Sequence, residues 1–295
     1  MRVTQSMLSN NMLRNLSNSY SRLGKYQEQI TSQKKISRPS DDPLVAMKGI
    51  TYRRNLQEVQ QYQRNFGEAY NWVDNADSSL DKAGLALDRI RELTVQVSND
   101  TYDATQRKAA AEEIKQLRNH LVNIANTKVG EKYLFNGTDT LKAPVTDGTP
   151  PTFNSPRNNG DVELELSKGI YIPVNVKPEE AFDSNLFKEI DDLIITLEDP
   201  SKSGSEVGQY LEVVDKHKAN VLNARADLGA RANRIELMED RVDTQEVIST
   251  KAMSENEDID FEKVITELIA QESVHRAALS IGARIIQPSL MDFLR

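Results

Sequence analysis

The stretch YRRNLQEVQQYQRNFGEAYNWVDNADSSLDKAGLALDRIRELTVQV, residues 52–97, decides the fold. Apolar or small residues recur in it every seven positions, in one series from Tyr52 to Thr94 and in another from Tyr62 to Val97. A period of seven keeps one narrow apolar stripe of an α-helix facing a neighbouring helix. No proline interrupts the stretch, and a helix of this length would be roughly 70 Å long. The pattern therefore predicts a rod rather than a globule.

A second apolar series with the same period runs from Val207 to Val242. Two seams of equal period, far apart in sequence, are expected to pack on each other, so that the chain runs out along the rod and returns. We interpret both seams as the core of the chain's own bundle rather than as a surface for a partner. The seam residues assigned to this core are Val59, Phe66, Val73, Leu80, Leu87, Val214, Val221, Leu228 and Ile235.

The composition excludes several classes of function. The chain has 295 residues, a net charge of −8, a mean hydropathy of −0.58 and no cysteine. Without a basic stripe we expect no nucleic-acid binding, and without cysteine there are no disulfides, thiolate metal sites or cysteine nucleophiles. We find no secretory signal and no apolar run of membrane-spanning length. The protein is therefore expected in the cytoplasm, or outside the cell by a route without a cleaved signal, and not inserted in a membrane.

No arrangement of residues points to catalysis, a metal or a cofactor. The three histidines fall on three different predicted helices, with no ligand spacing and no phosphate-binding glycine loop. Asp41 and Asp42 could be read as a cation site, but a helix cap fits better, with Asp42 as N-cap and Pro43 at the first helical position. We expect no enzyme activity.

The two ends of the chain carry apolar stripes of different strength. Residues 1 to about 37 form a weak amphipathic segment, which would be a marginal helix alone and either frays or orders under a partner. A second terminal helix is expected from about Met253 to Pro288, followed by an apolar tip. The terminal residues expected to form an assembly interface are Val3, Met7, Leu16, Leu23, Ile30, Ile265, Leu268, Ile281, Ile285, Leu290, Phe293 and Leu294.

The middle of the chain differs from both rods. A helix is expected to end near Gly130, with a short strand at residues 133–135 leading into an Asn-Gly turn. Residues 138–185 hold most of the prolines, and alternating apolar residues flank Ser167-Lys168-Gly169, which predicts a hairpin. A helix is expected to resume at Leu186.

Five blocks of sequence together resemble bacterial flagellin. They occur in the order and spacing of that family, with blocks toward both ends and a free-form middle. The blocks are MRVTQSML at 1–8, SRPSDDP at 37–43, LDRIRELTVQVSND at 87–100, EEIKQLRNHLVNIANTKVGEKYLFNG at 112–137 and LGARANRIE at 228–236.

Within this family, the start RVTQSML, the end PSLMDFLR and the short middle resemble the proteins of the hook–filament junction more than filament flagellin. The resemblance implies a secreted structural part of the flagellum, exported unfolded by the flagellar type III apparatus with an export chaperone. It implies an adapter ring of identical copies, between the other hook-associated junction protein and the flagellin that polymerises on it. It also implies that the terminal helices pair as an inner coiled coil.

The resulting fold class is mainly α: a long antiparallel helical rod with a small β-rich insert and paired terminal helices. Three domains are expected: 1–39 with 254–295 as the terminal coiled coil, 40–137 with 186–253 as the rod, and 138–185 as the insert. Arg89 and Leu93 stand where flagellin is detected by an animal innate receptor, so the resemblance also raises receptor recognition. Two alternatives stay open: a minor flagellin of the filament, and a cytoplasmic coiled-coil scaffold.

Overall fold

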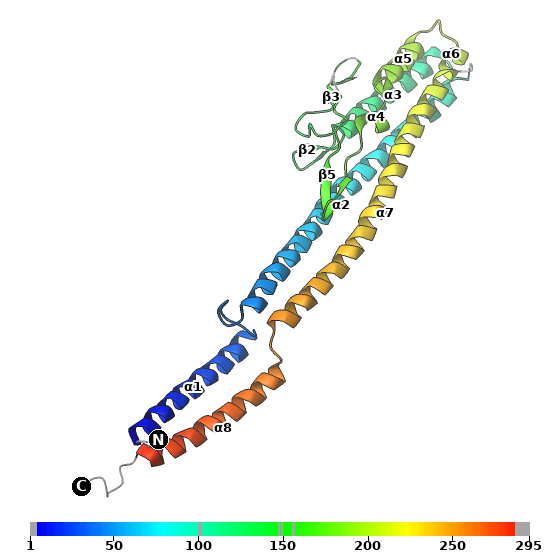
Figure 1. The fold of residues 1–295 in the computed structure, drawn as a ribbon. Helices are drawn as coiled ribbons and strands as arrows, with labels where there is room; N and C mark the ends of the chain where they lie inside the picture. The colour runs from blue at the N-terminus through cyan, green and yellow to red at the C-terminus, as the bar shows by residue number, and fades with distance from the viewer. Residues whose placement is uncertain (1–4, 100–101, 147, 149, 155–156, 287–295) are drawn as a thin grey trace, which may run out of the picture. The chain divides into compact units, whose positions relative to one another are not determined.

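The computed structural model describes residues 5–99, 102–146, 148, 150–154 and 157–286, and its contacts group the chain into two compact units (Figure 1). The terminal unit consists of Met1–Glu58 and Gln245–Arg295, and the rod unit of Val59–Thr244. Two long helices, α2 (Pro43–Val97) and α7 (Tyr210–Glu257), contribute residues to both units.

In the rod unit, α2 and α7 lie side by side and antiparallel (Figure 1). The phenol of Tyr70 donates to Glu239 at 2.6 Å, and farther along α2 the guanidinium of Arg91 donates to Asp215 at 2.6 Å. Residue numbers thus rise along one helix as they fall along the other. The predicted out-and-back path of the chain is confirmed.

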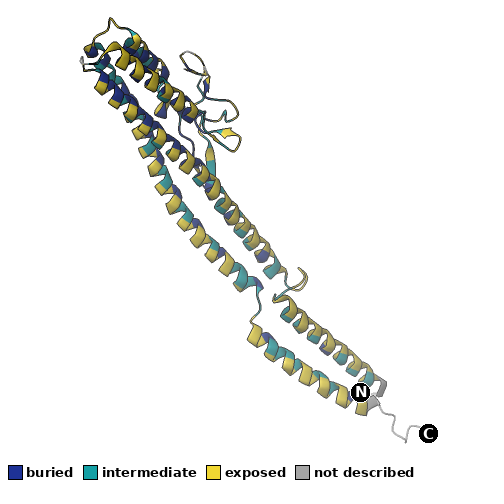
Figure 2. Ribbon diagram, turned by 180° about the vertical axis from the view of Figure 1, so that it is seen from behind, coloured by how far each residue is buried: buried dark blue, intermediate teal, exposed yellow. Residues whose placement is uncertain are grey.

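The seam of period seven becomes the core of the rod unit. All nine seam residues named from the sequence are buried, and Leu80 and Leu87 have no exposed surface. Three further helices pack beside α2 and α7 at the end of the pair where α2 ends and α7 begins (Figure 1): α3 (Ala104–Ala125), α5 (Leu186–Glu198) and the short α6 (Gly204–Gly208). Figure 2 shows the buried residues concentrated along these elements.

Local capping explains where two helices begin. Asp42 Oδ1 accepts the backbone N–H groups of Leu44 and Val45 at 3.0 and 3.1 Å, and Pro43 is the first helical residue of α2, as predicted. In the same way, Asp103 and Gln106 form a reciprocal capping box at the start of α3.

The described residues contain three two-stranded antiparallel sheets, of which the second and third lie within the β-rich insert predicted at 138–185. They pair β1 (Lys128–Val129) with β2 (Lys132–Tyr133), β3 (Val145–Thr146) with β4 (Thr152–Phe153), and β5 (Glu163–Ser167) with β6 (Ile170–Pro173). The predicted hairpin at 167–169 is confirmed, and Gly169 turns it with a positive φ of 73°. The insert also holds a one-turn helix, α4 (Pro178–Ala181).

Two boundaries in this region were predicted wrongly. Helix α3 ends at Ala125 rather than near Gly130, because the side chain of the next residue, Asn126, bonds the backbone of Val145. Asn126 Oδ1 accepts the N–H of Val145 at 3.1 Å, and Asn126 Nδ2 donates to the carbonyl of Val145 at 3.1 Å. The expected strand at 133–135 extends only to Tyr133, since the next two side chains turn into the core and are buried.

In the terminal unit, α1 (Gln5–Ser32) and α8 (Phe261–Ile286) form an antiparallel pair. The last helix begins later than the predicted Met253, because α7 continues to Glu257. Asp260 then starts α8 by accepting the N–H of Lys263 at 3.1 Å. The mainly-α fold class is confirmed, whereas the three-domain division stays a prediction: contacts group 138–185 with the rod helices, and 40–58 and 245–253 with the terminal helices.

Candidate assembly surface

Few side chains are buried between the paired terminal helices α1 and α8. Among the described side chains of α1 only Ser19 is buried, and among those of α8 only Val264 and Gly282. Ser19 Oγ accepts a hydrogen bond from Gln271 Nε2 at 3.0 Å and lies 3.2 Å from His275 Nδ1. The centre of this contact is therefore polar, and it removes little apolar surface from water.

Helices α1 and α8 also meet where Met12 lies against Gly282. A Cβ built on Gly282 would lie 3.0 Å from Met12 Cε, so a larger residue there would require the Met12 side chain to shift slightly. Farther along, the rings of Tyr20 and His275 lie 6.1 Å apart. A helix pair with so small a shared core depends on other contacts to stay ordered.

Large apolar side chains on both terminal helices face solvent. Tyr20 is 72% exposed, and eight other apolar side chains of these helices are about half exposed: Met7, Leu8, Leu13, Phe261, Ile269, Val274, Leu279 and Ile281. Single exposed apolar residues are ordinary on protein surfaces, whereas many of them along two adjacent helices are typical of a contact surface, so these helices remain the candidate assembly surface.

The structure divides the terminal residues predicted from the sequence into three groups. Met7 and Ile281 are exposed, whereas Leu16, Leu23, Ile30, Ile265 and Leu268 are half-buried. Outside the described residues, or without a described side chain, are Val3, Ile285, Leu290, Phe293 and Leu294. Sequence reasoning missed Leu8, Leu13 and Leu279, whose only signal was that they are large apolar residues lying off the main stripe.

A polar joint closes the terminal unit where α1 ends and α8 begins. Lys34 Nζ donates to Asp258 Oδ1 at 2.6 Å, and Arg53 donates to Glu257 Oε2 at 2.8 Å. Their backbones join as well, because Lys35 N–H donates to the carbonyl of Glu257 at 2.7 Å. The hydrogen bond from Lys34 lowers the pKa of the Asp258 carboxyl, and the same bond raises the pKa of Lys34.

Glu257 is buried in this joint, with 3% of its surface exposed. Its Oε2 accepts from Arg53, but its Oε1 lies against Gly49 and has no hydrogen-bond partner. A Cβ on Gly49 would overlap this oxygen. Glycine at this position of α2 is therefore required for the carboxylate to enter the joint.

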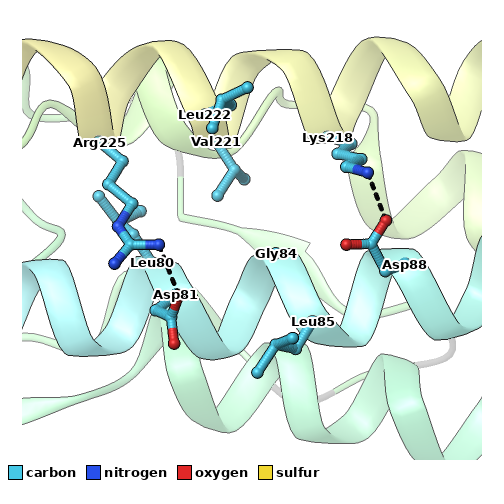
Figure 3. A pocket seen from close by; sticks show the side chains of 9 residues that line it. All are labelled: Leu80, Asp81, Gly84, Leu85, Asp88, Lys218, Val221, Leu222 and Arg225. Carbon is cyan, nitrogen blue, oxygen red and sulfur yellow. Dashed lines mark hydrogen bonds and ion pairs between the residues drawn. The ribbon is translucent and has the colours of Figure 1, made fainter.

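In the rod unit, a pocket lies between α2 and α7, and its lining includes the exposed side chains of Leu85 and Leu222 (Figure 3). The pocket has a volume of about 130 Å³ and lies over Gly84, between the ion pairs Asp81–Arg225 and Asp88–Lys218. Both acids already have basic partners, so the pocket offers no unpaired charged group for catalysis. In the part of the chain that the structure describes, no cluster of side chains could hold a metal ion.

The two residues named for receptor recognition do not share a surface. Arg89 is exposed and donates to Glu113 at 2.7 Å and to Glu92 at 3.0 Å, whereas Leu93 is buried in the rod core with 4% of its surface exposed. Leu93 therefore offers almost no side-chain surface to a receptor in this conformation.

These features define a class of protein built mainly from long α-helices, in which the paired terminal helices carry exposed apolar side chains. None of the described helices is both long and apolar enough to cross a bilayer.

Family models identify the class more closely. The model of the bacterial flagellin N-terminal helical region matches residues 3–140, and that of the flagellin C-terminal helical region matches residues 211–294. The chain belongs to the bacterial flagellin family, which is a family of structural flagellar proteins.

Individual relatives within the family match over nearly their whole length. The chain is 26% identical to flagellar hook-associated protein 3 of Escherichia coli, over 93% of both chains. It is also 26% identical to flagellin of Bacillus subtilis, over 97% of both chains. The crystal structure of flagellar hook-associated protein 3 from Legionella pneumophila has the same fold, with a TM-score of 0.64 and 16% identity over 70% of this chain and 98% of that one.

Proposed function

We propose that this protein is a structural component of the bacterial flagellum that acts as an adapter at the hook–filament junction, on which flagellin polymerises. The observation that carries this proposal is the match to hook-associated protein 3 of Escherichia coli over 93% of both chains. The start RVTQSML and the end PSLMDFLR, which differ from those of filament flagellin, support the same assignment.

The physical division of labour in the chain supports an adapter role. The rod unit has a continuous apolar core and holds its shape without a partner, whereas the terminal helices bury little between them and expose apolar side chains. Such a chain is stiff in one part and incomplete in the other. Its incomplete part gains order by packing against neighbouring subunits.

The partners follow from this role. Copies of the chain would form a ring, with the other hook-associated junction protein on one side and flagellin on the other. Export would use the flagellar type III apparatus and a chaperone that covers the apolar terminal surface. The chain has no catalytic part in this assembly, because its work is done by shape, register and stiffness.

Gene deletion combined with immunogold labelling tests the proposal. Cells without the protein should not swim and should release unpolymerised flagellin into the medium, because flagellin has no base on which to polymerise. In complemented cells, gold should label one band at the hook end of isolated flagella. Normal swimming after deletion, or label confined to the cell body, would contradict the adapter role.

A minor flagellin of the filament is the second candidate. It is favoured by the match to flagellin of Bacillus subtilis over 97% of both chains. The same labelling separates the two, since a filament subunit would be labelled along the whole filament. Purified protein that grows into long filaments without flagellin would also support the second candidate.

A further inference from the structure

A basic cleft lies in the terminal unit, between α1 and the segment that follows it. Its volume is about 430 Å³, and its walls carry four cationic side chains but only two carboxylates, Glu28 and Asp41. The cations are Lys25, Lys34, Lys35 and Arg38. We call this set of residues the basic cleft.

The charges of the basic cleft are only partly neutralised within the chain. Lys34 pairs with Asp258, and Lys35 Nζ donates to the backbone carbonyl of Glu255. Within the described ranges, Lys25 and Arg38 form no ion pair, but both act on Asp41: the hydrogen bond from the Arg38 backbone and, to a smaller extent, the charge of Lys25 lower the pKa of that carboxyl. The floor is also open, because a Cβ built on Gly24 would meet nothing within 4 Å.

An acidic face of matching character lies on α7, in the rod unit. Glu236, Glu239, Asp240 and Asp243 are spaced by three and four residues, which places their side chains on one side of the helix. Glu239 accepts from Tyr70 at 2.6 Å and Asp243 accepts from Gln63 at 3.0 Å, but in the part of the chain that the structure describes none of the four is in an ion pair with a lysine or arginine. We call these four residues the acidic face.

Tyr70 of α2 lies beside these carboxylates and donates to Glu239. Burial, the hydrogen bond to Glu239 and the negative charges of Glu236 and Asp240 all raise the pKa of Tyr70. The acidic face thus has hydrogen-bond partners in Tyr70 and Gln63, and among the described side chains its carboxylates form no ion pair.

We propose that the basic cleft of one copy binds the acidic face of the next copy in the assembly. The partner is a second copy because one chain carries both complementary surfaces, and each has charged side chains outside any ion pair: Lys25 and Arg38 in the basic cleft, and the four carboxylates of the acidic face. A contact between two different patches is heterologous, so repeating it builds a ring or a helix rather than a closed pair. The inference rests on the proposed adapter role and adds a contact that sets the register between subunits.

Cysteine crosslinking in assembled flagella tests this contact directly. The chain has no cysteine, so two single variants, Lys25→Cys and Asp240→Cys, can be co-expressed in the deletion strain without background. A short bismaleimide reagent should link them into a dimer, whereas neither variant expressed alone should give one. Glu212→Cys, an exposed acid on the same helix, replaces Asp240→Cys as the matched control and should give no dimer with Lys25→Cys.

Charge exchange provides the second measurement. Lys25→Glu with Arg38→Glu should reduce the yield of a crosslink between other residues of the two surfaces about tenfold, because attraction becomes repulsion. Asp240→Lys with Asp243→Lys should do the same, and co-expression of the two reversed chains should restore the yield. Raising the salt concentration should weaken the contact of the native chain.

The outcomes separate this inference from the adapter role. If gold still labels the hook end but Lys25→Cys and Asp240→Cys give no dimer, the contact is refuted and the adapter role stands. A crosslink formed inside a purified single chain carrying both cysteines would equally refute the contact between copies.

Discussion

Replacement of Leu87 by alanine should destabilise the rod unit strongly. The Leu87 side chain has no exposed surface in the core formed by the α2 seam. Alanine removes three carbons, which corresponds to roughly 2.4 kcal/mol of lost transfer free energy. The cavity left behind raises the free-energy cost to about 3–4 kcal/mol. For a unit of this size, the midpoint of thermal unfolding should fall by about 10 °C.

Thermal unfolding followed by circular dichroism measures this fall, and Leu23→Ala is the matched control. Leu23 is half-buried on α1, in the terminal unit, so its truncation should cost about 1 kcal/mol at most. The main transition, which reports the rod unit, should stay where it is. In cells the relative effects of the two variants should be the opposite. At a temperature where both variants keep a folded rod, Leu23→Ala should impair incorporation into flagella more than Leu87→Ala does.

One result would refute this reasoning. If Leu23→Ala lowered the main transition as far as Leu87→Ala does, the terminal helices would be part of the same cooperative core. The division into a self-supporting rod and an incomplete terminal unit would then be lost.

Three further predictions concern single groups. Gly49→Ala should destabilise the polar joint by about 1–3 kcal/mol, because the added Cβ displaces a buried carboxylate. Gly24→Ala, on the open floor of the basic cleft, should be neutral or stabilising by about 0.5–1 kcal/mol. Hydrogen exchange of α1 measures both variants, and equal effects would contradict the steric argument. Because the pKa of Asp258 is lowered in the folded protein, its hydrogen bond with Lys34 stabilises the fold at pH values above the pKa of the unfolded carboxyl, and this stability is lost as the pH falls through the lower folded pKa. Asp258→Asn should therefore remove that part of the acid dependence of α1–α8 unfolding. An unchanged pH profile would count against the bond. The raised pKa of Tyr70 should keep its phenol protonated when most tyrosines ionise. Tyr70→Phe should therefore leave the ultraviolet titration of the native protein unchanged near pH 11, whereas in denaturant the amplitude of the titration should fall by one tyrosine. A loss of amplitude in the native titration would show that Tyr70 ionises normally.

The long helices could be predicted because a strict period of seven leaves one interpretation. Every seventh residue of an α-helix returns to nearly the same side, so Phe66, Leu80 and Leu87 had to share one face, and the structure buries all three. The start of α2 was equally predictable, since Asp42 followed by Pro43 is a local signal that needs no knowledge of distant residues.

Boundaries set by distant contacts could not be predicted in this way. Asn126 ends α3 because its side chain bonds Val145, nineteen residues later, and nothing near Asn126 in sequence announces that partner. Likewise, α7 continues past Met253 until Asp258 meets Lys34 from the other end of the chain. Both helix ends are thus determined by tertiary contacts rather than by local sequence.

The candidate surface was predictable in kind but not in detail. The stripe of α1 was visible from its spacing, yet that pattern could not tell which apolar residues face α8 and which face solvent. Leu16 and Leu23 are half-buried, while Leu8 and Leu13, which lie off the stripe, are exposed. The basic cleft was also invisible, because it depends on how the segment after α1 folds back on the helix.

The antiparallel pairing of α1 and α8 has a mechanical consequence. Because the pair is antiparallel, the start of α1 and the end of α8 lie at the same end of the pair. Tension that pulls the two chain ends apart therefore loads the contacts between the helices one after another. With a polar centre and few buried side chains, each contact yields at low force. The chain would thus lose its terminal helices well before the tightly packed end of the rod, where α3 and α5 lie, begins to open.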